Sequence, residues 1–274
     1  MISFPNAKIN LGLHIKKKRS DGYHDLETLY YPIAYYDILE IVEAKSFHLS
    51  FSGIAIPGDA EGNLCAQAYQ LLKTKFPALP GLKTYLHKNI PTGAGLGGGS
   101  SDGAFMLHLV NKKFKLGLND NILGELTLKL GSDCPFFILN KPSLGLGRGE
   151  ILKPVPLDLS QYSFVLINSG LNISTKWAFS KITPMNREKS VQQIISQPIT
   201  SWKKELLNDF EPPVFQLYPA LAMIKEKLYQ SGALYASMTG SGSSLFGIFD
   251  RENDGRKKFL KDQPGSIELP AWSR

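Results

Sequence analysis

The chain has 274 residues, 43% hydrophobic side chains and a formal net charge of +7, so it can bury a sizeable core in one large domain or two modest ones. No stretch approaches the roughly 20 apolar residues that span a bilayer, and residues 1 to 10 lack the apolar run of a secretory signal. We therefore expect a cytoplasmic protein without a membrane partner. Cys65 and Cys134 are too few for a disulfide framework or a structural zinc site, and we predict two reduced thiols.

The positive charge is spread along the chain apart from one cluster, Lys16 to Arg19. The turn residues Ser20, Asp21 and Gly22 follow it, which predicts a solvated hairpin tip. A nucleic-acid binder would bind generic RNA or DNA with strong salt dependence. The dispersed charge makes that class unfavourable, and we expect no nucleic-acid partner.

Strands are predicted in the first fifth of the chain. Apolar and polar residues alternate from Ala7 to Ile15, which is typical of a half-buried strand that presents Lys8 and Asn10 on the same face. Residues 23–31, 37–44 and 47–52 read as further strands or extended segments. An antiparallel sheet is expected.

A helix over residues 63–75 and a strand over 83–89 are predicted next, followed by a glycine-rich segment and a second helix. Ser100, Ser101 and Asp102 supply capping residues for that second helix. Helical character also fits residues 119–130, after which a polar break precedes an apolar run that ends at Leu139.

A shift toward Gly and Pro between residues 145 and 156 predicts a boundary between two domains, residues 1–150 and 151–274. The second half reads as strands and helices that intermix. Because antiparallel connections are expected throughout, the sequence predicts an α+β fold of two lobes. The elements expected in the second half are a strand over 163–168, helices near 175–181, 191–196, 202–208 and 219–230, and a strand pair over 233–239 and 244–249.

The glycine-rich segment carries the strongest functional signal. Such a density of glycine is entropically costly unless the backbone needs positive φ or must approach a ligand closely. A helix that begins directly afterwards points unpaired N–H groups and its positive dipole end at the segment, so we expect it to bind the phosphate chain of a nucleotide. The predicted nucleotide-binding residues are Pro91, Thr92, Gly93, Ala94, Gly95, Leu96, Gly97, Gly98, Gly99, Ser100 and Ser101.

Other readings of this segment fit less well. A flexible linker does not usually lie between a strand and a capped helix. Gly93, Gly95 and Gly98 match the dinucleotide pattern GxGxxG, but that motif needs an acid at the end of the next strand, whereas Asp120 lies in a turn before a helix. A Walker A loop needs a following Gly-Lys-Ser/Thr, and a protein kinase needs HRD and DFG elements.

The segment resembles the second signature of the GHMP kinases. Its triple glycine before Ser-Ser resembles the form that this signature takes in the diphosphocytidyl-methylerythritol kinase branch. Further segments resemble the same family in the same order, so the resemblance covers nearly the whole chain. They are residues 5–11 (Pro-Asn-Ala-Lys-Ile-Asn-Leu), 19–24 (Arg-Ser-Asp-Gly-Tyr-His), 131–136 (Gly-Ser-Asp-Cys-Pro-Phe), 147–150 (Gly-Arg-Gly-Glu), 208–211 (Asn-Asp-Phe-Glu) and 239–244 (Thr-Gly-Ser-Gly-Ser-Ser).

The resemblance implies a two-lobed GHMP kinase fold with catalysis in the cleft, and transfer of the γ-phosphoryl group of ATP to the 2-hydroxyl of 4-diphosphocytidyl-2-C-methyl-D-erythritol. It implies Asp133 as the base that accepts the hydroxyl proton and Lys8 as the cation that holds this carboxylate and stabilises the transferring group. ATP and Mg²⁺ are implied, although no metal ligands are readable, and the protein would be a monomer or homodimer. The substrate-binding residues implied are Asn10, Tyr23, His24, Phe179, Thr239, Gly240 and Ser241.

Several alternatives stay open at this stage. Asp133 could be a helix N-cap, Lys8 and Asn10 could be outward strand residues, Phe179 could be core, and Trp177 could stack on the base in its place. Asp102 stands where the family often has Asn, and its charge would repel a nucleotide unless it faces away. The chain could also be another GHMP kinase, for a mevalonate-type acid, homoserine or a sugar, or a ligand-binding protein without turnover.

Overall fold

The computed structural model describes residues 1–56, 62–270 and 272, and these divide into two compact units. The first unit consists of Met1–Ala7, Tyr35–Thr92 and Gly97–Lys141, and the second of Lys8–Ala34, Gly93–Leu96 and Pro142–Arg274. Each unit therefore contains segments that lie far apart in the sequence. This division differs from the predicted domain boundary near residue 150. The two domains 1–150 and 151–274 therefore stay a prediction from the sequence.

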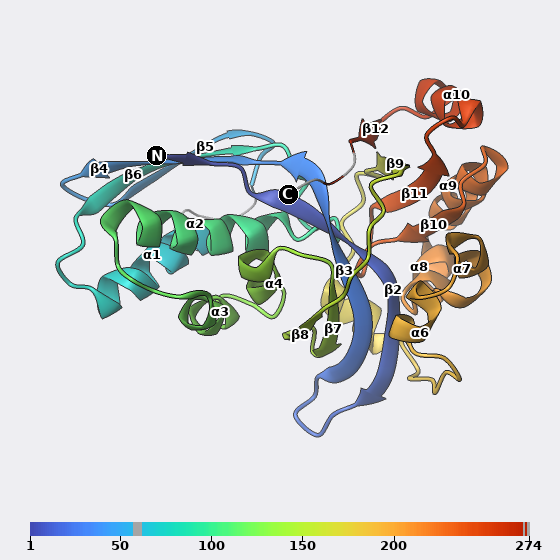
Figure 1. The fold of residues 1–274 in the computed structure, drawn as a ribbon, viewed down its shortest axis with the longest axis horizontal. Coiled ribbons are helices and arrows are strands. Elements are labelled where there is room, and N and C mark those ends of the chain that lie inside the picture. Colours follow the sequence, from blue (N-terminus) through green and yellow to red (C-terminus); the bar gives the residue numbers. More distant parts are fainter. Residues whose placement is uncertain (57–61, 271, 273–274) are drawn as a thin grey trace. The chain divides into compact units, whose positions relative to one another are not determined.

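The first unit is built on a four-stranded sheet with the order β1-β4-β6-β5. Strand β6 pairs antiparallel with β4 and parallel with β5. The helix α2 contacts β4 and packs against α1, α3 and α4, and Figure 1 shows α1 and α2 on one side of this sheet. The elements are β1 (Ile2–Ser3), β4 (Ile38–Ala44), β5 (His48–Gly53), α1 (Leu64–Lys75), β6 (Gly81–Lys88), α2 (Gly98–Phe114), α3 (Asp120–Leu128) and α4 (Cys134–Leu139).

The second unit contains two four-stranded sheets, with the orders β2-β3-β7-β8 and β10-β11-β9-β12. The pairs β3–β7, β7–β8, β9–β11, β10–β11 and β9–β12 are all antiparallel. Its elements are β2 (Asn6–Lys18), β3 (His24–Tyr36), β7 (Ser143–Gly147), β8 (Ile151–Pro154), β9 (Tyr162–Ile167), α5 (Thr175–Ser180), α6 (Val191–Ile195), α7 (Ile199–Glu205), α8 (Glu211–Leu217), α9 (Pro219–Gln230), β10 (Tyr235–Met238), β11 (Leu245–Asp250), α10 (Asp254–Asp262) and β12 (Ser266–Leu269).

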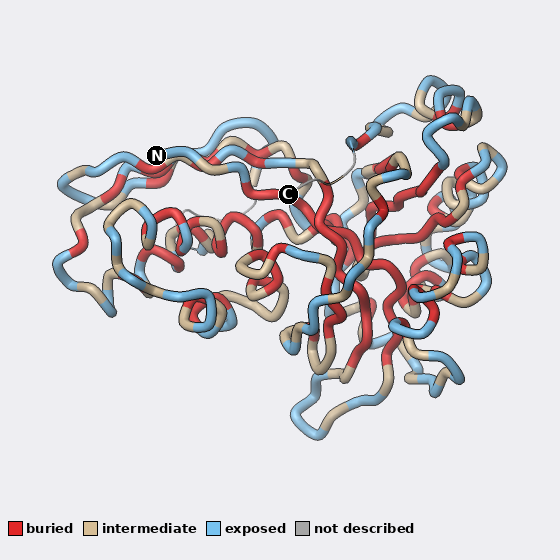
Figure 2. Tube along the Cα trace, viewed as in Figure 1, coloured by how far each residue is buried: buried red, intermediate tan, exposed pale blue. Residues whose placement is uncertain are grey.

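Each unit has its own hydrophobic core. In the first unit, side chains from α1, α2 and α3 pack with those from β4 and β6, with Leu72, Leu82 and Val110 fully buried. In the second unit, the core joins β2, β9 and β11 to α8 and α9, through residues such as Ile15, Val165 and Leu228. Figure 2 shows the long buried course of β2 and β3.

Most predicted elements are confirmed, with boundaries shifted by a few residues. The helix expected over 63–75 is α1, with the Asn63 side chain accepting from Cys65 N as its N-cap, and the helix expected over 219–230 is α9. The α+β class is also confirmed.

The prediction of a half-buried strand at residues 7–15 was wrong, because Asn6 to Ile15 are buried on both faces of β2. Alternation of polar and apolar residues therefore did not mark a solvent face here. The strands predicted to form an antiparallel sheet belong to different sheets, and β5 lies parallel to its neighbour. No described helix is both long and apolar enough to cross a membrane.

Candidate functional site

Lys8 and Asn10 lie side by side on β2, in the second unit, and both side chains are buried. The Lys8 ammonium donates a hydrogen bond to Asn10 Oδ1 at 2.6 Å and to the carbonyl oxygen of Gly95 at 3.0 Å. The backbone N–H of Lys8 also donates to the carbonyl of Leu96 at 3.0 Å. The structure thus brings the predicted catalytic lysine to the glycine-rich segment, and the outward-strand reading of Lys8 and Asn10 was wrong.

Thr239 joins the same cluster from the segment after β10. Its hydroxyl accepts from the backbone N–H of Asn10 at 3.0 Å and lies 3.2 Å from Gly95 O, to which it donates. The Asn10 amide donates in turn to the hydroxyl of Thr28 at 3.0 Å. Residues 8, 10, 95 and 239, which are widely separated in the sequence, therefore form one buried polar cluster, which we call the Lys8 cluster.

The close approach of two glycine-containing segments explains why Gly95 is required. Its φ is +79°, and a Cβ built there would lie 2.0 Å from the carbonyl oxygen of Thr239. Gly240, with φ of +58°, faces Gly95 from the other segment. The predicted need for positive φ and close backbone approach is confirmed at this position, where the close neighbour is another part of the chain.

The helix α2 begins at Gly98, and the N-cap residue Gly97 has φ of +71°. Because glycine has no side chain, no side-chain hydrogen bond caps this end, so the first N–H groups of the helix are not satisfied by a cap. The prediction that Ser100, Ser101 and Asp102 act as caps was wrong, since they lie inside the helix. The uncapped turn and its positive dipole end are the features that favour anion binding.

Asp102 is buried and faces Lys88, the last residue of β6. The Lys88 ammonium donates to Asp102 Oδ2 at 2.7 Å and also binds Asp37 Oδ2. Asp102 is therefore held within the first unit as an ion-pair partner of Lys88, and its side chain does not cap the helix.

Asp133 occupies the N-cap position of α4, but its side chain makes no cap hydrogen bond. The helix begins with Cys134 and has Pro135 in its first turn, which suits a helix start. The N-cap reading is thus right for the backbone position and wrong for the side chain. Burial raises the pKa of the neighbouring Cys134 thiol to about 12, and both cysteines are free and buried, as predicted.

His24 and Phe179 stack in the second unit, with ring centroids 5.0 Å apart and an interplanar angle of 19°. Phe179 also meets Phe210 edge to face at 4.9 Å. Burial lowers the pKa of His24, and Lys18 lowers it further, so the ring is held neutral near pH 7. Tyr23 stays 55% exposed, with the guanidinium of Arg148 4.7 Å from its ring centroid.

Two residues that the sequence reading did not assign support the glycine signature at 239–244. The Asn208 amide donates to the carbonyls of Met238 and Gly240, at 2.7 and 2.9 Å. The hydroxyls of Ser241 and Thr175 lie 3.0 Å apart. Asn208 belongs to the Asn-Asp-Phe-Glu segment, which was the only signal in the sequence that could have marked it.

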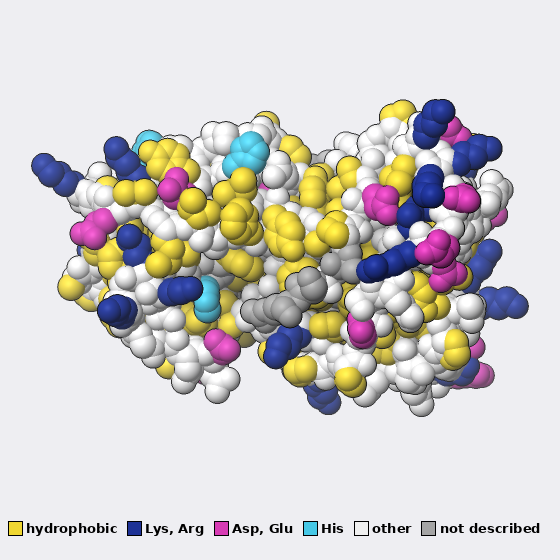
Figure 3. Space-filling view, turned by 45° about the horizontal axis from the view of Figure 1, so that its top comes forward, with side chains coloured by type: hydrophobic (Ala, Val, Ile, Leu, Met, Phe, Trp, Pro, Cys, Tyr) yellow, Lys and Arg dark blue, Asp and Glu magenta, His cyan; other side chains and the backbone are white. Residues whose placement is uncertain are grey.

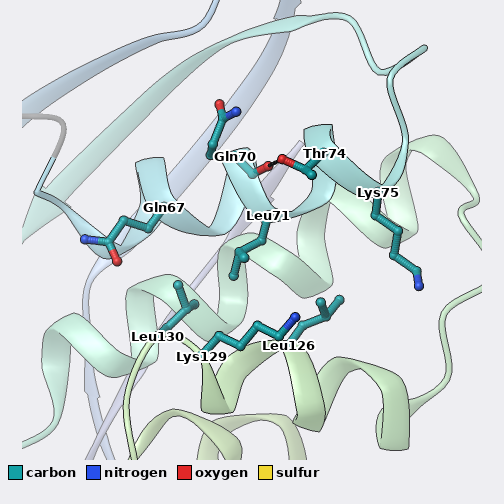
Figure 4. Close-up of a pocket in the computed structure, with 8 residues that line it drawn as sticks. All are labelled: Gln67, Gln70, Leu71, Thr74, Lys75, Leu126, Lys129 and Leu130. Atoms are coloured by element: carbon teal, nitrogen blue, oxygen red, sulfur yellow. Dashed lines mark hydrogen bonds between the residues drawn. The ribbon is translucent and has the colours of Figure 1, made fainter.

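The part of the chain that the structure describes holds no group of three or more His, Cys, Asp or Glu side chains able to bind a metal ion. A cavity of about 470 Å³ lies between α1 and the end of α3, and Figure 4 shows amide and lysine side chains among the residues that line it. It is lined by Gln67, Gln70, Leu71, Thr74, Lys75, Leu126, Lys129 and Leu130. On the face shown in Figure 3, lysine and arginine side chains are interspersed with acidic and neutral ones and form no continuous basic patch.

Two family models match the chain: the GHMP kinases N-terminal domain over residues 63–141 and the GHMP kinases C-terminal domain over residues 190–261. A 4-diphosphocytidyl-2-C-methyl-D-erythritol kinase from Bacteroides fragilis is 51% identical over 92% of this chain and 93% of its own length. A protein of the same name from Bacteroides thetaiotaomicron is 48% identical with the same coverage.

The chain belongs to the 4-diphosphocytidyl-2-C-methyl-D-erythritol kinase family. A crystal structure of a 4-(cytidine 5'-diphospho)-2C-methyl-D-erythritol kinase superposes with a TM-score of 0.84, at 31% identity and 98% coverage of both chains. The mevalonate kinase of Methanococcus jannaschii, at 14% identity and a TM-score of 0.73, shares the fold. Because the two GHMP kinase models match this chain, it is part of the GHMP superfamily, whose members are ATP-dependent phosphotransferases acting on small molecules. The predicted fold and enzyme class are confirmed.

Proposed function

We propose that the chain transfers the γ-phosphoryl group of ATP to the 2-hydroxyl of 4-diphosphocytidyl-2-C-methyl-D-erythritol, within non-mevalonate isoprenoid biosynthesis. The observation that most supports this is the 51% identity over 92% of the chain to a kinase of that name. The buried Lys8 cluster supports it independently, because it joins three of the family signatures through hydrogen bonds.

The glycine-rich segment from Pro91 to Ser101 is the proposed site for the phosphates of ATP. Backbone N–H groups at the uncapped start of α2, together with the helix dipole, favour a polyanion. Positive φ at Gly93, Gly95 and Gly97 curves the backbone in a way that other residues resist. This site would hold the triphosphate mainly through the backbone and would place little demand on side-chain charge.

Asp133 is the proposed base. It would accept the proton of the 2-hydroxyl as the oxygen attacks the γ-phosphorus, while the bond from phosphorus to the bridging β–γ oxygen breaks and ADP leaves. Lys8 would stabilise negative charge on the transferring group and hold the carboxylate. An amide and a carbonyl oxygen orient the Lys8 ammonium beside the glycine-rich segment, which suits that task.

Tyr23, His24 and Phe179 are proposed to recognise the cytidyl group, and Asn10, Thr239, Gly240 and Ser241 the remaining polar groups of the substrate. The His24–Phe179 stack holds both rings in a fixed orientation, which supports base recognition by stacking and by hydrogen bonds from the imidazole. Tyr23, exposed and backed by Arg148, has its outer face available for a second aromatic ring.

Magnesium is proposed to enter with ATP. Because the described residues form no group of three or more His, Cys, Asp or Glu side chains that could hold a metal ion, the fit is to an ion that takes most of its oxygen ligands from phosphates and water. Bound there, it would neutralise charge on the triphosphate. A cytoplasmic location and a monomeric or homodimeric state stay predictions.

The experiment that tests the function is ADP release with ATP and 4-diphosphocytidyl-2-C-methyl-D-erythritol, compared with the unphosphocytidylated 2-C-methyl-D-erythritol, mevalonate and homoserine. We expect turnover with the first compound alone. Asp133→Asn should lower kcat about 10³-fold with ATP affinity unchanged. Turnover with mevalonate or homoserine, or a wild-type rate in Asp133→Asn, would contradict the proposal; ATP binding without turnover on any compound would indicate a non-catalytic member.

A further inference from the structure

A second buried lysine lies in the first unit, beside the glycine-rich segment. Lys88 is 1% exposed, and its ammonium binds two carboxylates, Asp37 and Asp102. Asp37 is fixed in turn, because its other oxygen accepts the backbone N–H groups of Asn89 at 2.7 Å and Ile90 at 2.9 Å. We call Asp37, Lys88 and Asp102 the Lys88 triad.

The triad ties together three elements that meet at the start of α2. Asp37 precedes β4, Lys88 ends β6 and Asp102 lies in the second turn of α2. A Cβ built on Gly98 would lie 3.3 Å from the Lys88 ammonium nitrogen and 2.8 Å from Ile90 Cγ2. The ammonium is therefore packed directly against the first residue of the helix, and the triad fixes the position of that turn against the sheet.

The charges of the triad do not balance when all three groups are ionised, since two carboxylates face one ammonium. Asp102 Oδ1 is buried and accepts no hydrogen bond from any described residue, which is costly for an ionised carboxylate. Burial is the main cause that raises the pKa of Asp102 to about 8, while Lys88 opposes the rise and Asp37 adds to it. The pKa of Lys88 is raised because the two carboxylates outweigh the effect of its burial.

The described surroundings of Asp102 contribute few other titratable groups. The helix α1 contributes the thiol of Cys65, whose pKa is raised by burial and by the Asp102 charge. Strand β3 contributes the hydroxyl of Tyr35, whose pKa is raised by burial and by the charge of Asp37, while Lys88 lowers it. The Cys65 thiol and the Tyr35 hydroxyl stay neutral near pH 8, so the net charge of this region changes there through Asp102.

We propose that Lys88 and Asp102 are positioning residues for ATP: the Lys88 triad holds the first turn of α2 so that the backbone N–H groups at residues 97 to 100 face the phosphates. This inference rests on the proposed role of the glycine-rich segment. Asp102 would be neutral in the nucleotide complex, since a second buried negative charge behind this turn would oppose the triphosphate. Nucleotide binding would then be accompanied by proton uptake at pH values above 8.

The test measures KM for ATP and for the alcohol substrate, together with kcat, from pH 6.5 to 9. In the wild type, we expect the KM for ATP to rise up to about tenfold between pH 7 and 9, with a smaller change for the alcohol. Asp102→Asn keeps the shape and removes the titrating group, so its KM for ATP should be almost independent of pH. Lys88→Met should raise the KM for ATP about tenfold at pH 7, and kcat should change less.

Two control variants separate positioning from stability and from failure of the ATP site. Leu82→Ala removes a buried core side chain on the same strand as Lys88; it should lower Tm and leave both KM values unchanged. Gly97→Val places a β-branched side chain at φ of +71° in the proposed phosphate segment and should abolish ATP binding. Retained ATP affinity in Gly97→Val would refute the proposed site itself.

The positioning role is refuted if Gly97→Val loses ATP while Asp102→Asn keeps the wild-type pH profile. It is equally refuted if folded Lys88→Met has the wild-type KM for ATP. If Lys88→Met does not fold, the pH dependence of the KM for ATP in Asp102→Asn decides the question. Calorimetry of ATP binding in buffers of different ionisation enthalpy measures the proton uptake directly.

Discussion

The two buried lysines of this protein differ in what surrounds them. Lys8 is 3% exposed and donates to an amide oxygen and a backbone carbonyl, whereas Lys88 is 1% exposed and binds two carboxylates. Both lie beside the glycine-rich segment in sequence or in space, Lys8 through Gly95 and Lys88 through Gly98.

The difference shows that burial alone does not identify a catalytic lysine. Carboxylates neutralise an ammonium and fix it, which suits a structural or positioning task. The amide oxygen of Asn10 and the carbonyl oxygen of Gly95 orient the Lys8 ammonium beside the glycine-rich segment, where its charge can act on an incoming anion. The partners of a buried lysine therefore indicate its task better than its exposure does.

Removing each ammonium in turn tests whether the two lysines have different tasks, and it should give the largest effects. Lys8→Met should lower kcat about 10³-fold, because charge on the transferring phosphoryl group loses its stabilisation. Lys88→Met should act instead on the KM for ATP and on Tm. Steady-state kinetics with circular dichroism melts would measure both.

Lys8→Arg is a control that keeps the positive charge but changes the shape of the side chain. The planar guanidinium of arginine does not fit the site of the compact lysine ammonium, so kcat should stay low. If Lys8→Met and Lys88→Met gave the same split between kcat and KM, the two lysines would not differ in task.

The next largest effect concerns Gly95, which belongs to the Lys8 cluster. Gly95→Ala would place a Cβ 2.0 Å from the carbonyl oxygen of Thr239 at φ of +79°, so the two segments would have to separate. We expect ATP affinity to fall about 10²-fold and Tm to fall as well, as measured by nucleotide titration and thermal unfolding.

Gly124→Ala is the matched control. Gly124 lies within α3, and nothing lies within 4 Å of a Cβ built there, so alanine should leave activity unchanged and raise helix stability slightly. Equal losses in the two variants would show that the close approach at Gly95 is not required.

A smaller effect on activity is expected for the aromatic residues, which belong to neither the Lys8 cluster nor the Lys88 triad. Phe179→Ala should raise the KM for the cytidyl substrate about tenfold, because the ring stacked on His24 at 5.0 Å is lost. The KM for ATP should stay unchanged. Trp177→Ala distinguishes the two aromatic candidates: if it has the larger effect on that KM, the base stacks on Trp177.

The smallest effect is a pH dependence of stability that comes from Asp102. An acid whose pKa is raised from 3.8 to about 8 in the folded state binds its proton more tightly when folded. Its contribution to the free energy of unfolding is therefore present at low pH and is lost as pH rises toward 8. The Tm of the wild type should fall between pH 6 and 9 by about 3 °C more than that of Asp102→Asn. An equal fall in Tm for the two proteins would show that a group other than Asp102 causes the pH dependence.

Sequence reasoning identified the residues of the Lys8 cluster, because each of them lies in a family signature. Local patterns also located most helices, for example α9, which begins at Pro219 and has a helical spacing of apolar residues. The alternation in β2 was misread, since a strand that is covered on both faces can still alternate when its polar side chains, such as Lys8 and Asn10, bind one another and the backbone.

The Lys88 triad could not be predicted from the sequence. Asp37, Lys88 and Asp102 are separated by 51 and 14 residues, and no local period joins them. Asp102 was recognised as an unusual charge near the phosphate segment, but its partner depends on how β6 and α2 pack. The role of Asn208, which binds two carbonyls at residues 238 and 240, is non-local in the same way.

The interleaving of the two compact units limits how this protein can be dissected. The second unit takes β2 and β3 from the first 36 residues and pairs β3 with β7, more than a hundred residues later. A fragment that starts at residue 142 would expose the edge of β7 where β3 belongs, and unpaired strand edges invite aggregation. Split reporters or truncations of this kinase should therefore keep residues 8–34 with the C-terminal half, by circular permutation rather than by a single cut.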